Sequence, residues 1–245
     1  CAGFRTLFRR EPSMRLKRFS EMRRIDARVD RHMHSTYTDG RSTLEEIAAR
    51  AAEQGLTEVA VTDHVRAGSD FVQAYFAHID RVSGSHGVRM LKGIEAKIGG
   101  FDGSLDVRPE DRAHADLVVG SVHRFPLGRH LFAADRFPKD VAQAIELDLA
   151  LAAVRARSCH VLGHPGGMSL RAHGEFPADA FEELIAACRE GDVAFELNSS
   201  YHAPVIGLLV ELLARHDPFI SMGSDAHSPD RIGENWRLWG GMFHE

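Results

Sequence analysis

Short apolar runs alternate with longer amphipathic stretches along most of the chain. The apolar runs are typical of buried strands in a parallel sheet, and the amphipathic stretches are typical of the helices that connect such strands. Seven runs predict strands, at Val29–Met33, Glu58–Thr62, Val88–Ile94, Leu117–Val122, His160–Leu162, Val193–Leu197 and Pro218–Met222. This order predicts an α/β fold with a mainly parallel sheet, in the form of an incomplete or distorted barrel.

Amphipathic spacing predicts helices between these strands. Ser42 and Glu45 have the spacing of a capping box, residues 44–51 carry one apolar face, and Gly55 is expected to end this helix. Comparable helices are expected around Val141–Ala152, Phe181–Cys188 and Val205–Leu212. The stretch Ile98–Asp111 is rich in Gly and Asp and predicts a long loop or hairpin. Substrate choice is expected to depend on loops at 69–75, 99–106 and 124–138.

The length of 245 residues fits one large domain, and no repeat or linker indicates a second. No apolar run approaches the roughly 18 residues that a membrane span needs, so no membrane partner is expected. Three cysteines, at positions 1, 159 and 188, are too few and too scattered for a disulfide framework, which favours a cytoplasmic location. The oligomeric state stays open.

Charge is unevenly distributed along the chain. Residues 1–31 contain ten Lys or Arg and four Asp or Glu, which leaves 20 basic and 31 acidic residues in the remainder. We expect residues 1–28 to form a basic N-terminal arm outside the fold and residues 29–245 to form the barrel domain. An acidic domain is poorly suited to binding a polyanion, so a small substrate is the expected partner rather than a nucleic acid polymer.

Almost every predicted strand ends in a residue that can bind a metal ion. His32 and His34 are two residues apart, so they project from one face of the first strand. The C-terminal ends of parallel barrel strands meet at one mouth, so donors from different strands are expected to converge there. The predicted ligands are His32, His34, Asp39, His64, Glu95, His123, His164, Asp225 and His227.

Nine donors exceed the three or four protein ligands that one zinc or manganese ion takes. Two or three divalent ions are therefore predicted, with Glu95 able to bridge two of them, and zinc, manganese and iron all suit the donor set. A single histidine at a strand end is more often a hydrogen-bonded core residue. Six histidines with three carboxylates at matching positions favour a metal centre instead.

The order of these motifs along residues 30–228 resembles that of the PHP (polymerase and histidinol phosphatase) family of metal-dependent phosphoesterases. The resemblance implies a single-domain, distorted (β/α)7 TIM-like barrel with a trinuclear site. In some relatives a histidine stands at the position of Asp39. The motifs are specific as a set: His-x-His, Thr-Asp-Gly, Thr-Asp-His, Gly-Ile-Glu, Ser-Val-His, Gly-His-Pro and Ser-Asp-Ala-His. The family pattern implies three ligand sets. The first metal would be held by His32, His34, Glu95 and Asp225, and the second by Glu95, His123 and His164. The third metal would be held by Asp39, His64 and His227.

A centre of this kind favours hydrolysis of phosphate esters. Clustered divalent ions make hydroxide available near neutral pH, so we predict a metal-bound hydroxide as the nucleophile and no separate side-chain nucleophile. The expected activity is that of a small-molecule phosphatase or phosphodiesterase, similar to a histidinol phosphatase or a nucleotide phosphatase. Monoester and diester substrates both stay open.

Five further residues are candidates for contact with the substrate. Arg66, Lys97 and Arg124 each follow a strand end and are candidates for binding phosphate, although exposed charges and structural ion pairs are at least as common at such positions. Asn198 ends the sixth strand, where it could orient the substrate or cap the next turn. His202 is the candidate for protonating the leaving group, and a rim histidine without that role is the alternative.

Two other functional classes compete with this interpretation. Amidohydrolases, which cleave C–N bonds, also begin with His-x-His, but they commonly use a bridging lysine and a lone terminal aspartate. Glu95 and the pair Asp225 and His227 argue against that class. A nuclease or accessory module acting with DNA polymerase is the other alternative, because related barrels are fused to polymerases. The complete ligand set favours an active enzyme.

Overall fold

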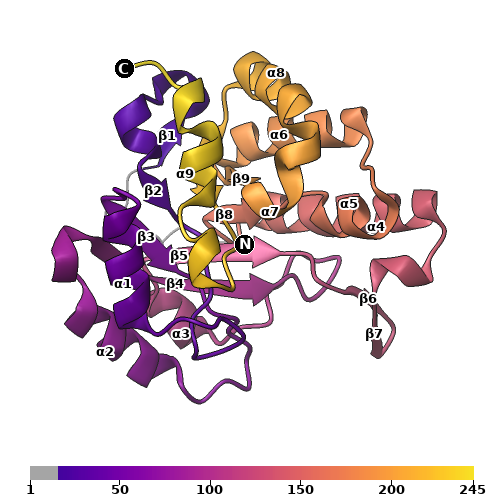
Figure 1. Cartoon of the computed structure of the whole chain (residues 1–245). Coiled ribbons are helices and arrows are strands. Elements are labelled where there is room, and N and C mark those ends of the chain that lie inside the picture. The colour runs from indigo at the N-terminus through magenta and orange to yellow at the C-terminus, as the bar shows by residue number, and fades with distance from the viewer. Residues whose placement is uncertain (1–15) are drawn as a thin grey trace, which may run out of the picture.

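The computed structural model describes residues 16–245 as a curved parallel sheet covered by helices (Figure 1). Within these residues, seven parallel strands are neighbours in space in the order in which they occur along the chain. They are β2 (Val29–Asp30), β3 (Glu58–Val61), β4 (Arg89–Lys97), β5 (Leu117–Ser121), β8 (Val161–Gly163), β9 (Ala194–Asn198) and β10 (Phe219–Gly223). The predicted distorted (β/α)7 barrel is confirmed.

The barrel closes between the segments that follow its first and last parallel strands. The His32 carbonyl accepts a hydrogen bond from the Asp225 N–H (2.7 Å), and the His34 N–H donates to the Ala226 carbonyl (2.9 Å). These bonds join backbone from the two ends of the domain at the C-terminal mouth of the barrel. Candidate ligands that are almost 200 residues apart in sequence therefore become neighbours.

Residues 16–28 differ from the sequence prediction, which placed them in an arm outside the fold. β1 (Lys17–Arg18) pairs antiparallel with β10, and the 3-10 helices η1 (Phe19–Glu21) and η2 (Arg24–Ala27) follow it. The guanidinium of Arg18 lies 4.3 Å from the ring centre of Phe219. Long basic side chains can cover apolar surface with their stems, which a count of charges does not reveal. Residues 1–15 of the predicted arm lie outside the described residues.

Helices cover the outside of the sheet (Figure 1). α4 packs against α6 and α6 against α8 on one side of the molecule, and α1 packs against α2 on another. Among residues 16–245, no helix combines the length and the apolar character that crossing a bilayer requires. The helices are α1 (Leu44–Glu53), α2 (Val72–Val82), α3 (Pro109–His114), α4 (Lys139–Ala156), α5 (Gly167–His173), α6 (Ala178–Gly191), α7 (Ser199–His202), α8 (Ile206–His216) and α9 (Glu234–Trp239).

Two details of the predicted helices need correction. The capping box of α1 is formed by Thr43 and Glu46, one residue later than predicted: the Thr43 hydroxyl accepts from the Glu46 N–H (3.2 Å), and the Glu46 carboxylate accepts from the Thr43 N–H (2.8 Å). In α4, Val141 is 40% exposed and so does not belong to the buried face. Gly55 follows α1 with a φ of 71°, which agrees with its predicted role as a stop.

Three segments predicted as loops contain regular structure. α2 begins inside the 69–75 loop, and its buried Val72, Phe76 and Ile79 have helical spacing that the sequence analysis did not use. Ile98 and Leu105 form an antiparallel bridge, which confirms the predicted hairpin. The 124–138 loop contains the hairpin of β6 (Phe125–Leu127) and β7 (His130–Phe132), which projects from the body in Figure 1, and then η4 (Ala134–Arg136).

Side chains inside the barrel change character from the bottom to the mouth. Because side chains two residues apart on a strand point to the same face, Leu91 shares the inward face of β4 with Glu95, and Ala194 shares that of β9 with Glu196. Each fully buried Leu or Val stabilises the fold by about 1.5–3 kcal/mol. The apolar layer at the bottom thus supports a charged layer at the mouth, and it consists of Ala60, Leu91, Leu117, Val119, Val161 and Ala194.

Candidate metal centre

Four histidines surround the buried carboxylate of Glu95 at the mouth of the barrel. Glu95 Oε1 lies 3.1 Å from His123 Nε2, 3.1 Å from His164 Nε2 and 3.3 Å from His32 Nε2. Glu95 Oε2 lies 2.9 Å from His64 Nδ1. These nitrogens come from four different strand ends, so the predicted convergence of the donors is present around this carboxylate.

A second carboxylate, Asp39, lies near three histidines and is closer to solvent than Glu95. Its Oδ2 atom lies 3.4 Å from His64 Nε2 and 3.4 Å from His227 Nε2, and its Oδ1 atom lies 3.8 Å from His34 Nδ1. The Asp39 side chain is 54% exposed, whereas that of Glu95 is 1% exposed. The centre therefore extends from a buried carboxylate out to an open one.

The third carboxylate, Asp225, lies against the His-x-His segment. Asp225 Oδ1 is 3.1 Å from His34 Nε2 and 3.7 Å from His32 Nε2. Three groups have candidate ligand atoms within 4.8 Å of one another: His34, Asp39, His64 and His227; His32, His34 and Asp225; and His64, Glu95 and His123. All nine predicted ligands are therefore brought together in one centre.

The chemistry of the donors fits divalent cations. His32 Nε2 and His34 Nδ1 are buried and make no hydrogen bond with any described residue. Buried polar atoms without partners are costly, and a bound ion removes that cost. With neutral imidazoles the three carboxylates carry three negative charges, which two or three divalent ions would more than balance.

The pKa values in the centre show how strongly its groups interact. Burial alone would lower the pKa of His32, but the charges of Glu196 and Glu95 outweigh it and raise that pKa well above the ordinary range. Burial alone would raise the pKa of Glu95, but the charges of His123 and His32 hold it well below the ordinary range. Metal ions would take the place of the protons that these pairs otherwise share.

Two candidate ligands stand on backbone that is unusual for their residue types. His164 has a φ of 28° and Asp225 has a φ of 55°. Side chains rarely adopt this left-handed region, and such conformations concentrate at functional sites. At His164 the conformation is held by a bond from its own N–H to Glu196 Oε2 (2.6 Å).

Glu196 is the main support of the centre, although it was not among the predicted site residues. His32 Nδ1–H donates to Glu196 Oε1 (2.8 Å), which leaves Nε2 of His32 free to face Glu95. Gly223 makes room for this contact, because a Cβ there would lie 2.3 Å from Glu196 Oε1 and 2.5 Å from the Cβ of His32. A charged residue at an inward position of an otherwise apolar strand was the signal that could have revealed it.

Two other buried aspartates hold the loops that carry candidate ligands. Asp63 accepts from the N–H of Ser35 (3.0 Å), from its hydroxyl (2.5 Å) and from the hydroxyl of Thr38, which fixes the loop before Asp39. Asp30 accepts from the Ser224 N–H (2.9 Å) and hydroxyl (2.5 Å), which fixes the loop before Asp225. Burial raises the pKa of Asp30 to about 6, against the lowering effect of these bonds.

His202 does not have the position of a general acid, so that prediction is corrected. Its side chain is fully buried, its Nδ1 accepts from the Asn198 N–H (3.1 Å), and its Nε2–H donates to the Pro165 carbonyl (3.0 Å). Both ring nitrogens are thus used in a neutral ring, and burial lowers the pKa of His202 to about 4. The ring connects α7 to the segment after His164.

Replacing His202 by glutamine is therefore expected to affect stability and not the protonation step. The loss of two buried hydrogen bonds should cost about 1–3 kcal/mol of unfolding free energy at pH 7.5. Because burial lowers the folded pKa to about 4, the wild-type histidine contributes stability above its ordinary pKa of about 6.5 and loses it as the pH falls toward 4. Urea unfolding at pH 7.5 and pH 5 should show a smaller difference between variant and wild type at pH 5. If the variant instead loses one of the two pH-dependent slopes of kcat that wild type shows, His202 acts as a general acid or base after all.

Asn198 is also buried and does not face the substrate. Its Oδ1 accepts from the Ser200 N–H (3.0 Å) at the start of α7, and its Nδ2 donates to Glu196 Oε2 (3.1 Å). The capping alternative is therefore confirmed, and the predicted contact with the substrate is corrected. Asn198 acts on the centre through Glu196.

The three candidate cations occupy different environments. Lys97 Nζ lies 3.4 Å from Asp106 Oδ2, so the structure gives it the ion-pair role. Arg66 is exposed, and its backbone N–H donates to the hydroxyl of Ser69 (3.0 Å). Arg124 is exposed beside His123 and lines a pocket next to the centre. Arg124 therefore has the best position of the three for contact with a bound anion.

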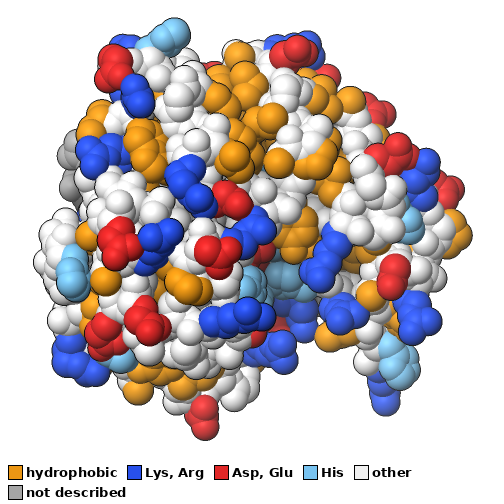
Figure 2. Space-filling view, in the orientation of Figure 1, with side chains coloured by type: hydrophobic (Ala, Val, Ile, Leu, Met, Phe, Trp, Pro, Cys, Tyr) orange, Lys and Arg blue, Asp and Glu red, His pale blue; other side chains and the backbone are white. Residues whose placement is uncertain are grey.

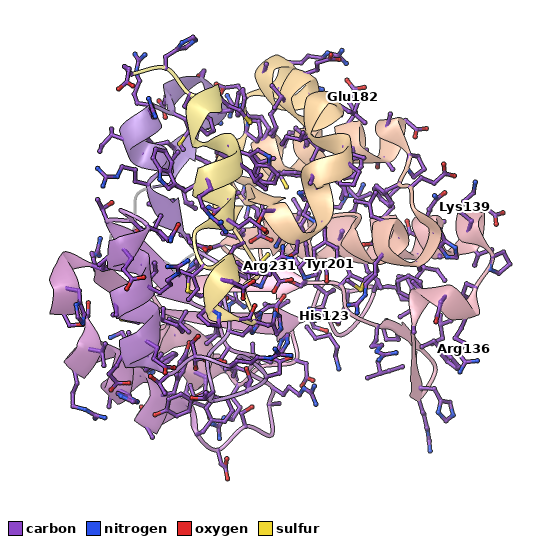
Figure 3. All side chains as sticks on the ribbon, in the orientation of Figure 1. His123, Arg136, Lys139, Glu182, Tyr201 and Arg231 are labelled. Carbon is purple, nitrogen blue, oxygen red and sulfur yellow. The ribbon has the colours of Figure 1, made fainter. Side chains whose placement is uncertain are left out.

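Tyr201 joins the centre, although the sequence analysis gave it no role. Its ring lies 4.9 Å from that of His164, and Figure 3 labels it at the barrel mouth near His123. Burial and the charge of Asp225 raise the pKa of Tyr201 to about 12, against a hydrogen bond with Arg171. The hydroxyl therefore stays protonated and can donate a hydrogen bond at neutral pH.

The family of the chain follows from comparison with known proteins. The PHP domain matches residues 30–200, which hold seven of the nine candidate ligands. The chain belongs to the PHP domain family. The chain is 31% identical over 214 residues to a protein of Syntrophotalea carbinolica named "Probable phosphatase", covering 83% of this chain and 81% of that protein.

Other relatives of this PHP domain have related names. "Probable phosphatase YcdX" of Escherichia coli O81 is 28% identical over 221 residues, covering 84% of this chain and 81% of that protein. Among solved structures, histidinol phosphate phosphatase from Lactococcus lactis, complexed with zinc, L-histidinol and phosphate, superposes with a TM-score of 0.66. That pair is 21% identical and covers 89% of this chain and 94% of the other, so it shows a shared fold.

Proposed function

We propose that this PHP domain hydrolyses phosphate monoesters of small molecules at a centre of two or three divalent metal ions. The observation that carries the proposal is the convergence of six histidines and three carboxylates, Glu95 among them, at the barrel mouth. Nothing in the packing of a barrel requires such a set, and it matches what metal-assisted phosphoryl transfer needs. Relatives named as phosphatases support the same class of reaction.

The proposed ligands divide into three sets, and Glu95 belongs to two of them. The first ion would be held by His32, His34, Glu95 and Asp225, the second by Glu95, His123 and His164, and the third by Asp39, His64 and His227. Imidazole and carboxylate ligands suit zinc, manganese and iron. When bound, such ions supply the nucleophile by lowering the pKa of water and neutralise charge on the phosphoryl oxygens.

The protein's own residues would orient this chemistry. Glu196 fixes the ring of His32, so the nitrogen that faces Glu95 keeps its lone pair. Arg124 would bind a phosphoryl oxygen beside His123, where a guanidinium can form two parallel hydrogen bonds. Tyr201, whose hydroxyl stays protonated, would donate a hydrogen bond at the same mouth.

Elemental analysis together with hydrolysis assays tests this function. Purified protein incubated with zinc, manganese or iron should bind two or three ions per chain and cleave an aryl phosphate, and a chelator should stop the cleavage. An aryl phosphodiester serves as the comparison, and faster cleavage of the diester would reject the monoester proposal. Protein that binds no metal under these conditions would reject the centre itself.

The Glu196 contact leads to a separate prediction about metal affinity. Glu196→Gln removes the charge that orients His32 and should weaken metal binding by about 10–100-fold. Competition with a fluorescent chelator measures the affinity. Glu182→Gln, at a residue of α6 that pairs with Arg215 on the surface (Figure 3), is the matched control and should bind like wild type. Equal affinities of wild type and Glu196→Gln would argue against the orienting role.

A further inference from the structure

A pocket of about 720 Å³ is formed by the β6–β7 hairpin and the residues that flank it. Its wall begins with Arg124, one residue after the candidate ligand His123, and continues through the hairpin to Phe137. Figure 2 shows this region as a hollow between the projecting hairpin and the barrel body, with histidine side chains visible in it. Its volume lies in the range of pockets that bind small molecules.

The walls of the pocket are largely apolar and include aromatic rings. Leu131 is 50% exposed and Phe132 is 37% exposed, which is unusual for side chains of this size on a short hairpin. The ring of Phe137 is fixed between two others, since its centre lies 5.7 Å from that of Phe125 and 5.9 Å from that of Phe132. The pocket thus offers a preformed surface against which a planar or apolar group can pack.

Two arginines give the same pocket a positive charge. Arg124 and Arg136 line it, and no carboxylate does so in the part of the chain that the structure describes. Neither guanidinium forms an ion pair with a described residue, whereas the nearby Lys139 is paired with Glu175. In Figure 3 Arg136 lies beside the hairpin, across the hollow from His123. Arg136 is therefore available to an anion at the end of the pocket farther from the metal centre.

We infer that this pocket binds the leaving group of the substrate, and that this leaving group combines an aromatic or apolar body with a second anionic group. The inference rests on the proposed phosphatase function. The phosphoryl group would lie at the metal centre beside Arg124, the apolar body would pack against Phe132 and Leu131, and the second anion would pair with Arg136. Phe132 and Arg136 are accordingly specificity residues.

A matched pair of esters tests the inference. The two probes are 2-naphthyl phosphate and 6-carboxy-2-naphthyl phosphate, which differ only in the second anionic group. Wild type should have a KM for the carboxylated ester that is about threefold to tenfold lower than its KM for 2-naphthyl phosphate, and Arg136→Gln should remove this difference. Phe132→Ala should raise KM for both esters. Arg129→Gln, at the hairpin tip outside the lining, is the control and should keep the preference.

Direct binding separates this inference from the proposed function. Calorimetry with 6-hydroxy-2-naphthoate, the leaving group of the carboxylated ester, needs no hydrolysis. Binding that weakens in Arg136→Gln would support the pocket even if wild type cleaved neither ester, and only the phosphatase proposal would then fail. Equal cleavage of both esters by wild type, an equal loss for both in Arg136→Gln, or binding of the naphthoate that does not depend on Arg136 would overturn the inference.

Discussion

Glu95→Gln is expected to lower kcat/KM of the metal-loaded protein by about a thousandfold or more, which is about 4 kcal/mol of transition-state stabilisation. Glu95 lies within 3.3 Å of nitrogens from four histidines, so in the proposed centre it would join two ions. Glutamine keeps the size of the side chain but removes its charge, and its nitrogen cannot act as a ligand. Steady-state hydrolysis of an aryl phosphate, with metal content measured on the same sample, gives the result.

The comparison variant for this experiment is Glu182→Gln on the surface of α6. It makes the same chemical change at an exposed ion pair and should keep the activity of wild type. A Glu95→Gln protein that retains activity within tenfold of wild type, with its full complement of metal, would contradict the bridging role. Circular dichroism of both variants shows whether the fold is intact.

Removing the metal is expected to lower the melting temperature by about 10 °C. An ion that binds only the folded state at a thousand times its Kd stabilises that state by about 4 kcal/mol. For a domain of this size, each kcal/mol shifts the melting temperature by about 2–4 °C. The effect should be large here, because removing the ions leaves buried ligand atoms such as His32 Nε2 and His34 Nδ1 without a hydrogen bond. Differential scanning calorimetry before and after chelation, followed by addition of zinc or manganese, measures it.

Three results would decide how this shift is understood. Glu95→Gln should show a smaller shift on chelation than wild type, because part of its metal is already lost. A wild-type melting temperature that chelator does not change, in protein shown to contain metal beforehand, would place that metal outside the buried donors. Recovery of the original melting temperature on adding metal shows that chelation did not damage the fold.

The strand ends and their donors could be predicted from sequence because both follow strict spacing. Parallel strands bury both faces, so each leaves a short apolar run, and the residue after the run lies at the barrel mouth. His123 and His164 could be placed in this way without any knowledge of their neighbours. Most of the nine donors follow this rule, whereas Asp39 lies further along the loop after the first strand.

The supporting residues could not be predicted because spacing does not distinguish their roles. Glu95 and Glu196 are both glutamates at inward strand positions. Only the fold shows that Glu95 faces four histidines, whereas Glu196 accepts a hydrogen bond from Nδ1 of His32. His202 was predicted at the rim because it follows a strand end, but α7 directs its side chain into the interior of the protein. In the same way β1 is recognised only by its pairing with a strand about 200 residues later.

That pairing has a consequence for how the domain is made. Lys17 lies opposite Ile220, and the barrel also closes through Asp225, so a chain emerging from the ribosome cannot complete the sheet until β10 has been synthesised. Until then the growing sheet has open edges, which is the state most prone to aggregation. Asp225 and His227 are also the last donors to appear. Full loading of the metal centre must therefore follow translation of nearly the whole domain, and a nascent chain holds only an incomplete site.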